Sequence, residues 1–134
     1  MADYLLDTHT LLWYAGADPR LPAAIGQLIA DPTNSILISR ASLWEITIKE
    51  SIGKLILSQP YAQWMQTLRT YDFYCLEITD AHLLKLSQLL SVKDHRDPFD
   101  RLLIAQALTE NLTLVSRDGK FAAYAEAGLH TRWA

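Results

Sequence analysis

The stretch ILISRASLWEITIKESIG, residues 36–53, contains the pattern that decides the fold class. Its first three residues form a short apolar run, which is typical of a strand buried on both faces of a sheet. Ser39 or Ser42 can then cap a helix that runs through Ser51, and Gly53 closes that helix. A strand followed at once by a helix is the unit from which α/β proteins are built.

The same alternation continues on both sides of this stretch. Short apolar runs predict further strands at 4–6, 73–78 and 112–116, and we expect a final extended segment at 130–133. Apolar residues at helical spacing predict helices at 21–29, 61–70, 79–90, 98–110 and 121–128. The 79–90 helix is expected to turn Leu83, Leu86 and Leu90 inward, and Asp97-Pro98 and Asn111 mark the ends of the next helix. We therefore expect an α/β protein whose mostly parallel sheet is covered by helices on both faces.

Length and charge set limits on the function. The chain has 134 residues, which fits a single domain spanning 1–134. Half of its residues are hydrophobic and 20% are charged, which excludes a disordered chain. A net charge of −3 argues against indiscriminate binding to nucleic acid. Any role with nucleic acid must therefore depend on a local site.

The N-terminal sequence and the cysteine count bear on location and chemistry. No apolar run approaches the ~20 residues needed to cross a bilayer, and Asp3 and Asp7 stand where a signal peptide would be basic and then apolar. We expect a cytoplasmic protein with no membrane association. Cys75 is the only cysteine, so an internal disulfide and a thiolate metal cluster are excluded.

Four acidic residues occupy positions that meet at one edge of such a sheet. Asp7 ends the first strand, Glu45 lies early in the helix after the second, Asp100 lies in the first turn of the 98–110 helix, and Asp118 follows the fourth strand. Ligands bind outside the carboxyl ends of parallel strands, where these positions converge. Clustered carboxylates repel one another unless a cation is present, and oxygen ligands favour Mg²⁺ or Mn²⁺ over Zn²⁺. Such ions can promote hydrolysis of a phosphodiester.

Each acid also has a purely structural interpretation. Ser42 and Glu45 fit the S-x-x-E capping box, Asp97 and Asp100 suit the start of a helix, and Asp118 precedes Gly119 in an ordinary turn pair. For Asp7 the functional interpretation is stronger, because a partly buried charge is costly without a partner. Among the aromatic residues, Trp44 is expected to pack inward as part of the core.

Four blocks of the sequence, taken in order, resemble a known family. They are Leu5 to His9, Ser39 to Ile46, Asp97 to Ala107, and Leu114 to Phe121. Together they resemble the PIN-domain nucleases, especially the VapC-like toxins of bacterial toxin–antitoxin pairs. The resemblance implies a three-layer α/β/α fold with a five-stranded parallel sheet and an endoribonuclease that depends on Mg²⁺ or Mn²⁺. It also implies a homodimer and a small antitoxin protein whose tail fills the active site.

The resemblance assigns roles residue by residue. Asp7 and Asp100 correspond to the family's metal-binding acids. Glu45 and Asp118 correspond to the remaining two acids, which complete the site or orient the attacking water. The family's hydroxyl near the fourth acid falls on Ser116. Asp97 is three residues before Asp100. We assign Asp97 as the helix cap or as a residue that supports the metal ligands without binding the metal itself.

Two other functions compete with the ribonuclease. A phosphatase related to the haloacid dehalogenases would use Asp7 as its nucleophile, but His9 stands where the second Asp of the D-x-D motif is required. A catalytically silent PIN-fold module would capture RNA or an antitoxin-like peptide without cleaving it. Retention of all four acids argues against that loss of activity.

Overall fold

The sheet at the centre of the molecule is five-stranded and wholly parallel. In the computed structural model, which describes residues 3–89 and 97–133, the strands lie in the order β3-β2-β1-β4-β5. They are β1 (Asp3–Leu6), β2 (Ser35–Ser39), β3 (Tyr74–Leu76), β4 (Thr113–Val115) and β5 (His130–Arg132). Each was expected from its apolar or extended run. The expectation of a mostly parallel sheet is thus confirmed, with every pairing parallel.

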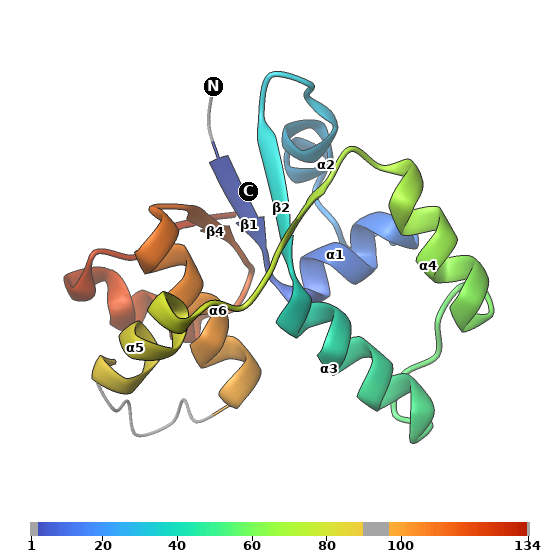
Figure 1. Ribbon diagram of the computed structural model, residues 1–134. Coiled ribbons are helices and arrows are strands. Elements are labelled where there is room, and N and C mark those ends of the chain that lie inside the picture. The colour runs from blue at the N-terminus through green and yellow to red at the C-terminus, as the bar shows by residue number, and fades with distance from the viewer. Residues whose placement is uncertain (1–2, 90–96, 134) are drawn as a thin grey trace.

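Helices cover both faces of this sheet. They are α1 (Thr8–Ala15), α2 (Ala23–Ala30), α3 (Arg40–Ser51), α4 (Tyr61–Thr70), α5 (Asp80–Gln88), α6 (Pro98–Glu110) and the 3-10 helix η1 (Gly119–Ala127). Figure 1 shows α5 and α6 on one side of the central strands, with α1, α2 and α4 on the other. The three-layer α/β/α architecture is confirmed. Among the described residues, no helix combines the length and apolar character required to span a membrane.

The core is divided into two parts by the alternation of side chains along the strands. In β1, Leu5 packs with Leu103 and Ile104 of α6, whereas Leu6 packs in the opposite layer with Leu11 of α1 and Ile46 of α3. These side chains are almost completely buried. Successive residues of a strand point to opposite faces, so a strand buried on both faces is apolar throughout.

The ends of α6 form as their residues predict. Asp97 caps the helix by accepting hydrogen bonds from the backbone N–H groups of Phe99 and Asp100, and Pro98 occupies the first helical turn. Asn111 follows the helix with φ 56° and ψ 50°, in the left-handed region. The left-handed conformation ends a helix, and Asn tolerates it better than most residues.

The inward face of α5 differs from the prediction. Leu83 is 50% exposed and Leu86 only partly buried, while Leu90 lies outside the described residues. The buried residue of this helix is His82, whose Nδ1 accepts a hydrogen bond from the Thr79 N–H. A polar side chain can take an inner position when its hydrogen bonds are satisfied.

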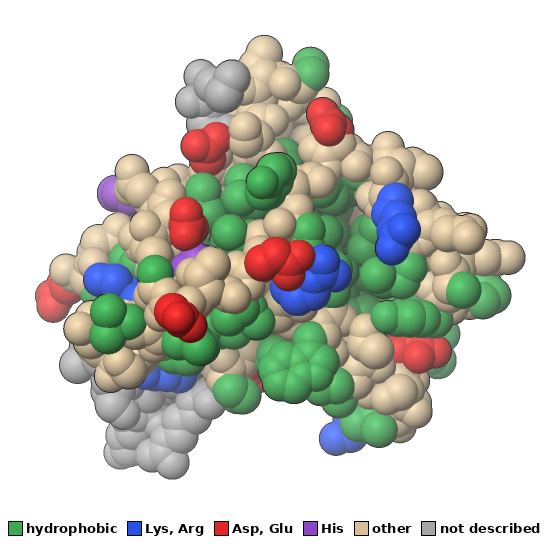
Figure 2. Space-filling view, in the orientation of Figure 1, with side chains coloured by type: hydrophobic (Ala, Val, Ile, Leu, Met, Phe, Trp, Pro, Cys, Tyr) green, Lys and Arg blue, Asp and Glu red, His purple; other side chains and the backbone are tan. Residues whose placement is uncertain are grey.

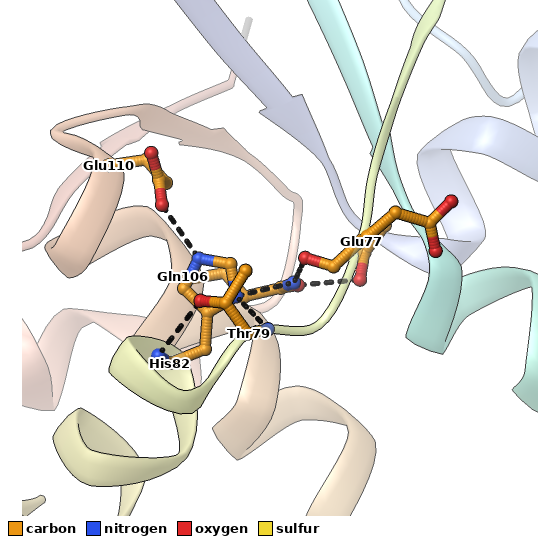
Figure 3. Close-up of polar contacts among 6 residues, drawn as sticks. Glu77, Thr79, His82, Gln106 and Glu110 are labelled. Carbon is orange, nitrogen blue, oxygen red and sulfur yellow. Dashed lines mark hydrogen bonds and ion pairs between the residues drawn. The ribbon is translucent and has the colours of Figure 1, made fainter.

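A buried polar network explains why His82 is tolerated there (Figure 3). The Nε2 atom of His82 lies 2.8 Å from Oε2 of Glu110, near the end of α6. The Gln106 side chain lies 3.3 Å from Nδ1 of His82, and its Oε1 accepts a hydrogen bond from the Ser39 hydroxyl. The network therefore links α5 and α6 to the end of β2.

Two further predictions fail at the helices next to the sheet. The chain forms α1 directly after β1, where no helix was expected, because Asp7 ends the strand and also caps the helix by accepting from the Thr10 N–H. Trp44, expected in the core, is 56% exposed. Its ring packs edge-on against the ring of Phe99, with 5.1 Å between the two ring centres. Apolar side chains reach the surface around α3 in Figure 2.

Candidate active site

Asp7 lies at the carboxyl end of the central strand with its side chain buried. Only 6% of the residue is exposed. Its Oδ1 accepts a hydrogen bond of 2.8 Å from the Thr10 N–H, and its Oδ2 accepts one of 2.5 Å from the Ser116 hydroxyl. Both donors are neutral, and within residues 3–89 and 97–133 no cationic side chain pairs with Asp7. A buried carboxylate in this state needs a counter-charge from elsewhere.

Ser116 connects Asp7 to Asp118. It directly follows β4 and is 5% exposed. Its Oγ donates to Asp7 and accepts a hydrogen bond of 3.0 Å from the Asp118 N–H. Asp118 is exposed and caps η1 by accepting from the Lys120 N–H at 2.9 Å. The residue that caps η1 is therefore joined to Asp7 through the Ser116 hydroxyl.

Glu45 is a second buried carboxylate, and it does not cap its helix. The N-cap of α3 is Ser39, which accepts from the Ala41 N–H, so the capping-box interpretation is wrong. Glu45 is 5% exposed. Its Oε1 accepts from the Thr8 hydroxyl at 2.7 Å, and its Oε2 lies 2.6 Å from the Lys49 ammonium. Thr8 is adjacent to Asp7 in sequence, which places Glu45 beside the end of β1.

Lys49 is in the electrostatic field of three acids. Its hydrogen bond to Glu45 raises the pKa of Lys49 above the ordinary value, against the lowering effect of burial. The negative charges of Glu45, Asp97 and Asp100 raise the pKa further. An opposite charge nearby favours the charged form of an amine. Glu45 is therefore the direct partner of Lys49, and the two acids at the start of α6 add smaller effects through their charges.

The six predicted site residues do not form one compact cluster in this structure. Asp7, Ser116 and Asp118 are joined by hydrogen bonds, and Glu45 lies next to them through Thr8. In the described part of the chain, no group of three or more His, Cys, Asp or Glu side chains is placed to hold a metal ion. The chemistry of the donors nevertheless fits a hard cation, because they are carboxylate oxygens and Asp7 has no counter-charge among the described residues.

Two cavities open beside these acids. The larger, of about 600 Å³, is lined by residues that include Thr8, Glu45, Lys49 and Lys54. The smaller, of about 370 Å³, is lined by residues that include Asp7, Arg117 and Asp118. His9 and Trp13 line both cavities. A ligand that spans both cavities could therefore contact Glu45 in the larger one and Asp7 and Asp118 in the smaller one.

The basic residues near this edge have different environments. The Arg117 guanidinium lies 4.7 Å from the centre of the Trp13 ring. Arg40 pairs with Glu77, and Arg101 donates to the Tyr124 hydroxyl. Of these cations, Arg117 stands in the cavity that contains Asp7.

Comparison with protein families decides the identity of the fold. The model of the PIN domain family matches residues 4–127. The chain belongs to the PIN domain family. The match extends from β1 to the end of η1, and it includes every residue assigned to the site from the sequence.

Individual relatives agree with this assignment. The PIN domain is 25% identical over 133 residues to ribonuclease VapC22 of Mycobacterium tuberculosis strain ATCC 25618 / H37Rv, covering 99% of this chain and all of that protein. It also resembles the structure of VapBC2 from Rickettsia felis bound to a DNA fragment from their promoter. That match has a TM-score of 0.73 and 21% identity, and it covers 98% of this chain and 99% of the other.

A second solved structure has the same fold. VapBC-5 from Mycobacterium tuberculosis, described as a member of the VapBC family of toxin-antitoxin systems, matches with a TM-score of 0.66 and 21% identity. The match covers the whole of both chains. At this identity the two structures establish the shared fold, and the function has to be argued from the site.

Proposed function

We propose that this PIN domain, as a single domain of residues 1–134, is an endoribonuclease that hydrolyses phosphodiester bonds of RNA and serves as the toxin of a toxin–antitoxin pair. One observation carries the proposal. Asp7 is a buried carboxylate at the end of the central strand, and the described residues offer it only neutral hydrogen-bond donors. A site that needs a cation and opens into two cavities suits a substrate with phosphate groups.

The metal dependence is part of this proposal. Asp7 and Asp100 would hold Mg²⁺ or Mn²⁺, and Glu45 and Asp118 would complete the site or orient the attacking water. A bound ion of this kind supplies positive charge that polarises the phosphodiester. The chain's own contribution is orientation, because Thr10 and Ser116 fix both oxygens of Asp7. Asp97 holds the first turn of α6 and thereby positions Asp100.

The partners follow from the substrate and the relatives. RNA would enter along the two cavities, where the Arg117 guanidinium is available to a phosphate. The named relatives include a ribonuclease and members of toxin–antitoxin pairs. We accordingly propose a small antitoxin protein as the regulator, a homodimer as the active form, and the cytoplasm as the place of action.

Cleavage of structured RNA by the purified protein and a D7N variant tests the function. We expect internal cleavage that requires Mg²⁺ or Mn²⁺. The cleavage rate should be at least ~100-fold lower in D7N, a larger loss than usually follows removal of a residue that only hydrogen-bonds to a metal ligand. The substitution keeps the size of the side chain and removes the charge. A D80N variant, altered at an exposed acid in the first turn of α5, is the matched control.

Two results would contradict the proposal. Release of phosphate from small monoesters without cleavage of RNA would favour the phosphatase with Asp7 as nucleophile. Binding of RNA or of an antitoxin-like peptide with no cleavage under any divalent ion would favour the silent module. Circular dichroism of both variants checks that the fold is retained.

A further inference from the structure

The two buried carboxylates of the site differ in how their charges are balanced. Asp7 accepts hydrogen bonds from a backbone N–H and a serine hydroxyl, neither of which carries charge. Glu45 accepts from the Thr8 hydroxyl and pairs with the Lys49 ammonium at 2.6 Å. Burying a carboxylate costs free energy, and a partner of opposite charge offsets that cost. Glu45 therefore already has its cation, whereas Asp7 lacks one in the described part of the chain.

The position of Lys49 reinforces this difference. Lys49 follows Glu45 by one turn of α3, and its ammonium also responds to the charges of Asp97 and Asp100. One positive charge thus already contacts Glu45 directly, and the charges of Asp97 and Asp100 act on it as well. A divalent ion bound to Glu45 would have to displace this ammonium or lie against it, and like charges at such short range repel strongly.

We propose that Lys49 takes the place of a second metal ion, so that this PIN domain binds one divalent cation, at Asp7, and uses Glu45 as a carboxylate held by Thr8 and Lys49. The inference rests on the proposed function and deepens it. Lys49 is a positioning residue here: it fixes the direction of Glu45 and supplies its counter-charge. Glu45 then remains free of metal and faces the larger cavity.

The number of Mn²⁺ ions bound in the absence of RNA tests this inference. Isothermal titration calorimetry, supported by electron paramagnetic resonance of free Mn²⁺, should give one ion for the wild type. The K49M variant keeps the alkyl stem and loses the charge, so Glu45 becomes available and we expect two ions. K49R keeps a cation and should bind one. K54M removes a lysine that lines the same cavity and makes no ion pair within the described ranges, so it should also bind one.

An E45Q variant keeps the inference testable if K49M does not fold. Because Glu45 is not a metal ligand in this arrangement, E45Q should still bind one ion, with an affinity less than tenfold below that of the wild type. D7N should lose binding altogether. Two ions in the wild type, one ion in a folded K49M, or a larger loss in E45Q would each overturn the inference.

Failure of the inference and failure of the proposed function give different results. Two ions in the wild type, together with RNA cleavage that D7N abolishes, would overturn the role of Lys49 and leave the nuclease intact. Absence of Mn²⁺ binding in the wild type would overturn both the inference and the proposed metal dependence.

Discussion

Ser116 joins two acids of the site through a single hydroxyl that makes two contacts. Its proton is donated to Asp7, and its oxygen accepts the Asp118 N–H. Asp7 and Asp118 are 111 positions apart in the sequence, and this hydroxyl joins the ends of β1 and β4 where both strands stop. A charge-assisted hydrogen bond of this kind fixes the direction of the carboxylate it contacts.

Removing the hydroxyl should therefore impair catalysis more than folding. We expect S116A to cleave RNA about 10- to 100-fold more slowly than the wild type, which is the usual effect of removing a residue that hydrogen-bonds to a metal ligand. S116T keeps the hydroxyl and should retain most of the activity. S87A is the matched control, since Ser87 is exposed and its hydroxyl donates to the carbonyl of Leu84, one turn earlier in α5. Initial rates under saturating Mn²⁺ measure the effect, and an unchanged rate in S116A would contradict this role.

At the scale of the elements, the sequence predicts those whose signals are local. The buried runs of β1 and β2 identify strands without knowledge of the rest of the chain. Asp97, Pro98 and Asn111 mark the ends of α6, and the structure uses all three in that way. Local signals fail where one residue serves two elements. Asp7 ends β1 and caps α1, so no linker separates the strand from the helix and the sequence does not mark where the helix begins.

The side chains that face inward are harder to predict than the elements. On α5 the leucine pattern pointed to Leu83, but tertiary hydrogen bonds to Gln106 and Glu110 bury His82 instead. At the site, the burial of Asp7 was foreseeable from its apolar neighbours. The pairing of Lys49 with Glu45 had an available signal, the i, i+4 spacing of opposite charges on one helix. The contact of Thr8 with Glu45 spans 37 residues and had no local signal.

Two tryptophans allow a quantitative test of how the helices pack. Trp64 of α4 is 2% exposed within the core, whereas Trp44 of α3 is 56% exposed and packs edge-on against the ring of Phe99. W64A should lower the free energy of unfolding by about 3–5 kcal/mol, the cost of emptying a buried aromatic site. W44A should lower the free energy of unfolding by about 0.5–1.5 kcal/mol, which is the typical contribution of an edge-on ring pair. Urea unfolding followed by circular dichroism measures both, and equal losses would place Trp44 in the core after all.

At the scale of the whole molecule, the parallel sheet explains how an acidic protein can have a site for RNA. All five strands run in the same direction, so the residues that follow β1, β2 and β4 emerge at one edge. The acids of that edge are balanced locally, by Lys49 on one side and by the proposed metal ion on the other. The net charge of −3 therefore does not describe what a substrate meets there.

The same balance predicts how stability changes at alkaline pH. The pKa of Lys49 is raised chiefly by its hydrogen bond to Glu45, and burial raises the pKa of Tyr14 and of the Cys75 thiol. Each group keeps its proton to a higher pH in the folded chain than in the unfolded chain. The folded state therefore binds more protons on the alkaline side, and the free energy of unfolding decreases as pH rises. These contributions are complete below the unfolded values and are lost from about pH 8.5 for the thiol and about pH 10 for the other two groups.

Urea midpoints measured under reducing conditions, from about pH 8 to about pH 11, should accordingly fall. The Y14F and K49M variants, each lacking one of the three groups, should show a shallower fall than the wild type, because fewer protons are released on unfolding at high pH. Y71F is the matched control for Y14F, since the neighbouring phenol contributes to the Tyr14 shift only through its charge and should flatten the profile less. A midpoint that stays constant across this range in the wild type would mean that the folded and unfolded chains hold these protons equally well, and that the Lys49 ammonium is not retained by the acids around it.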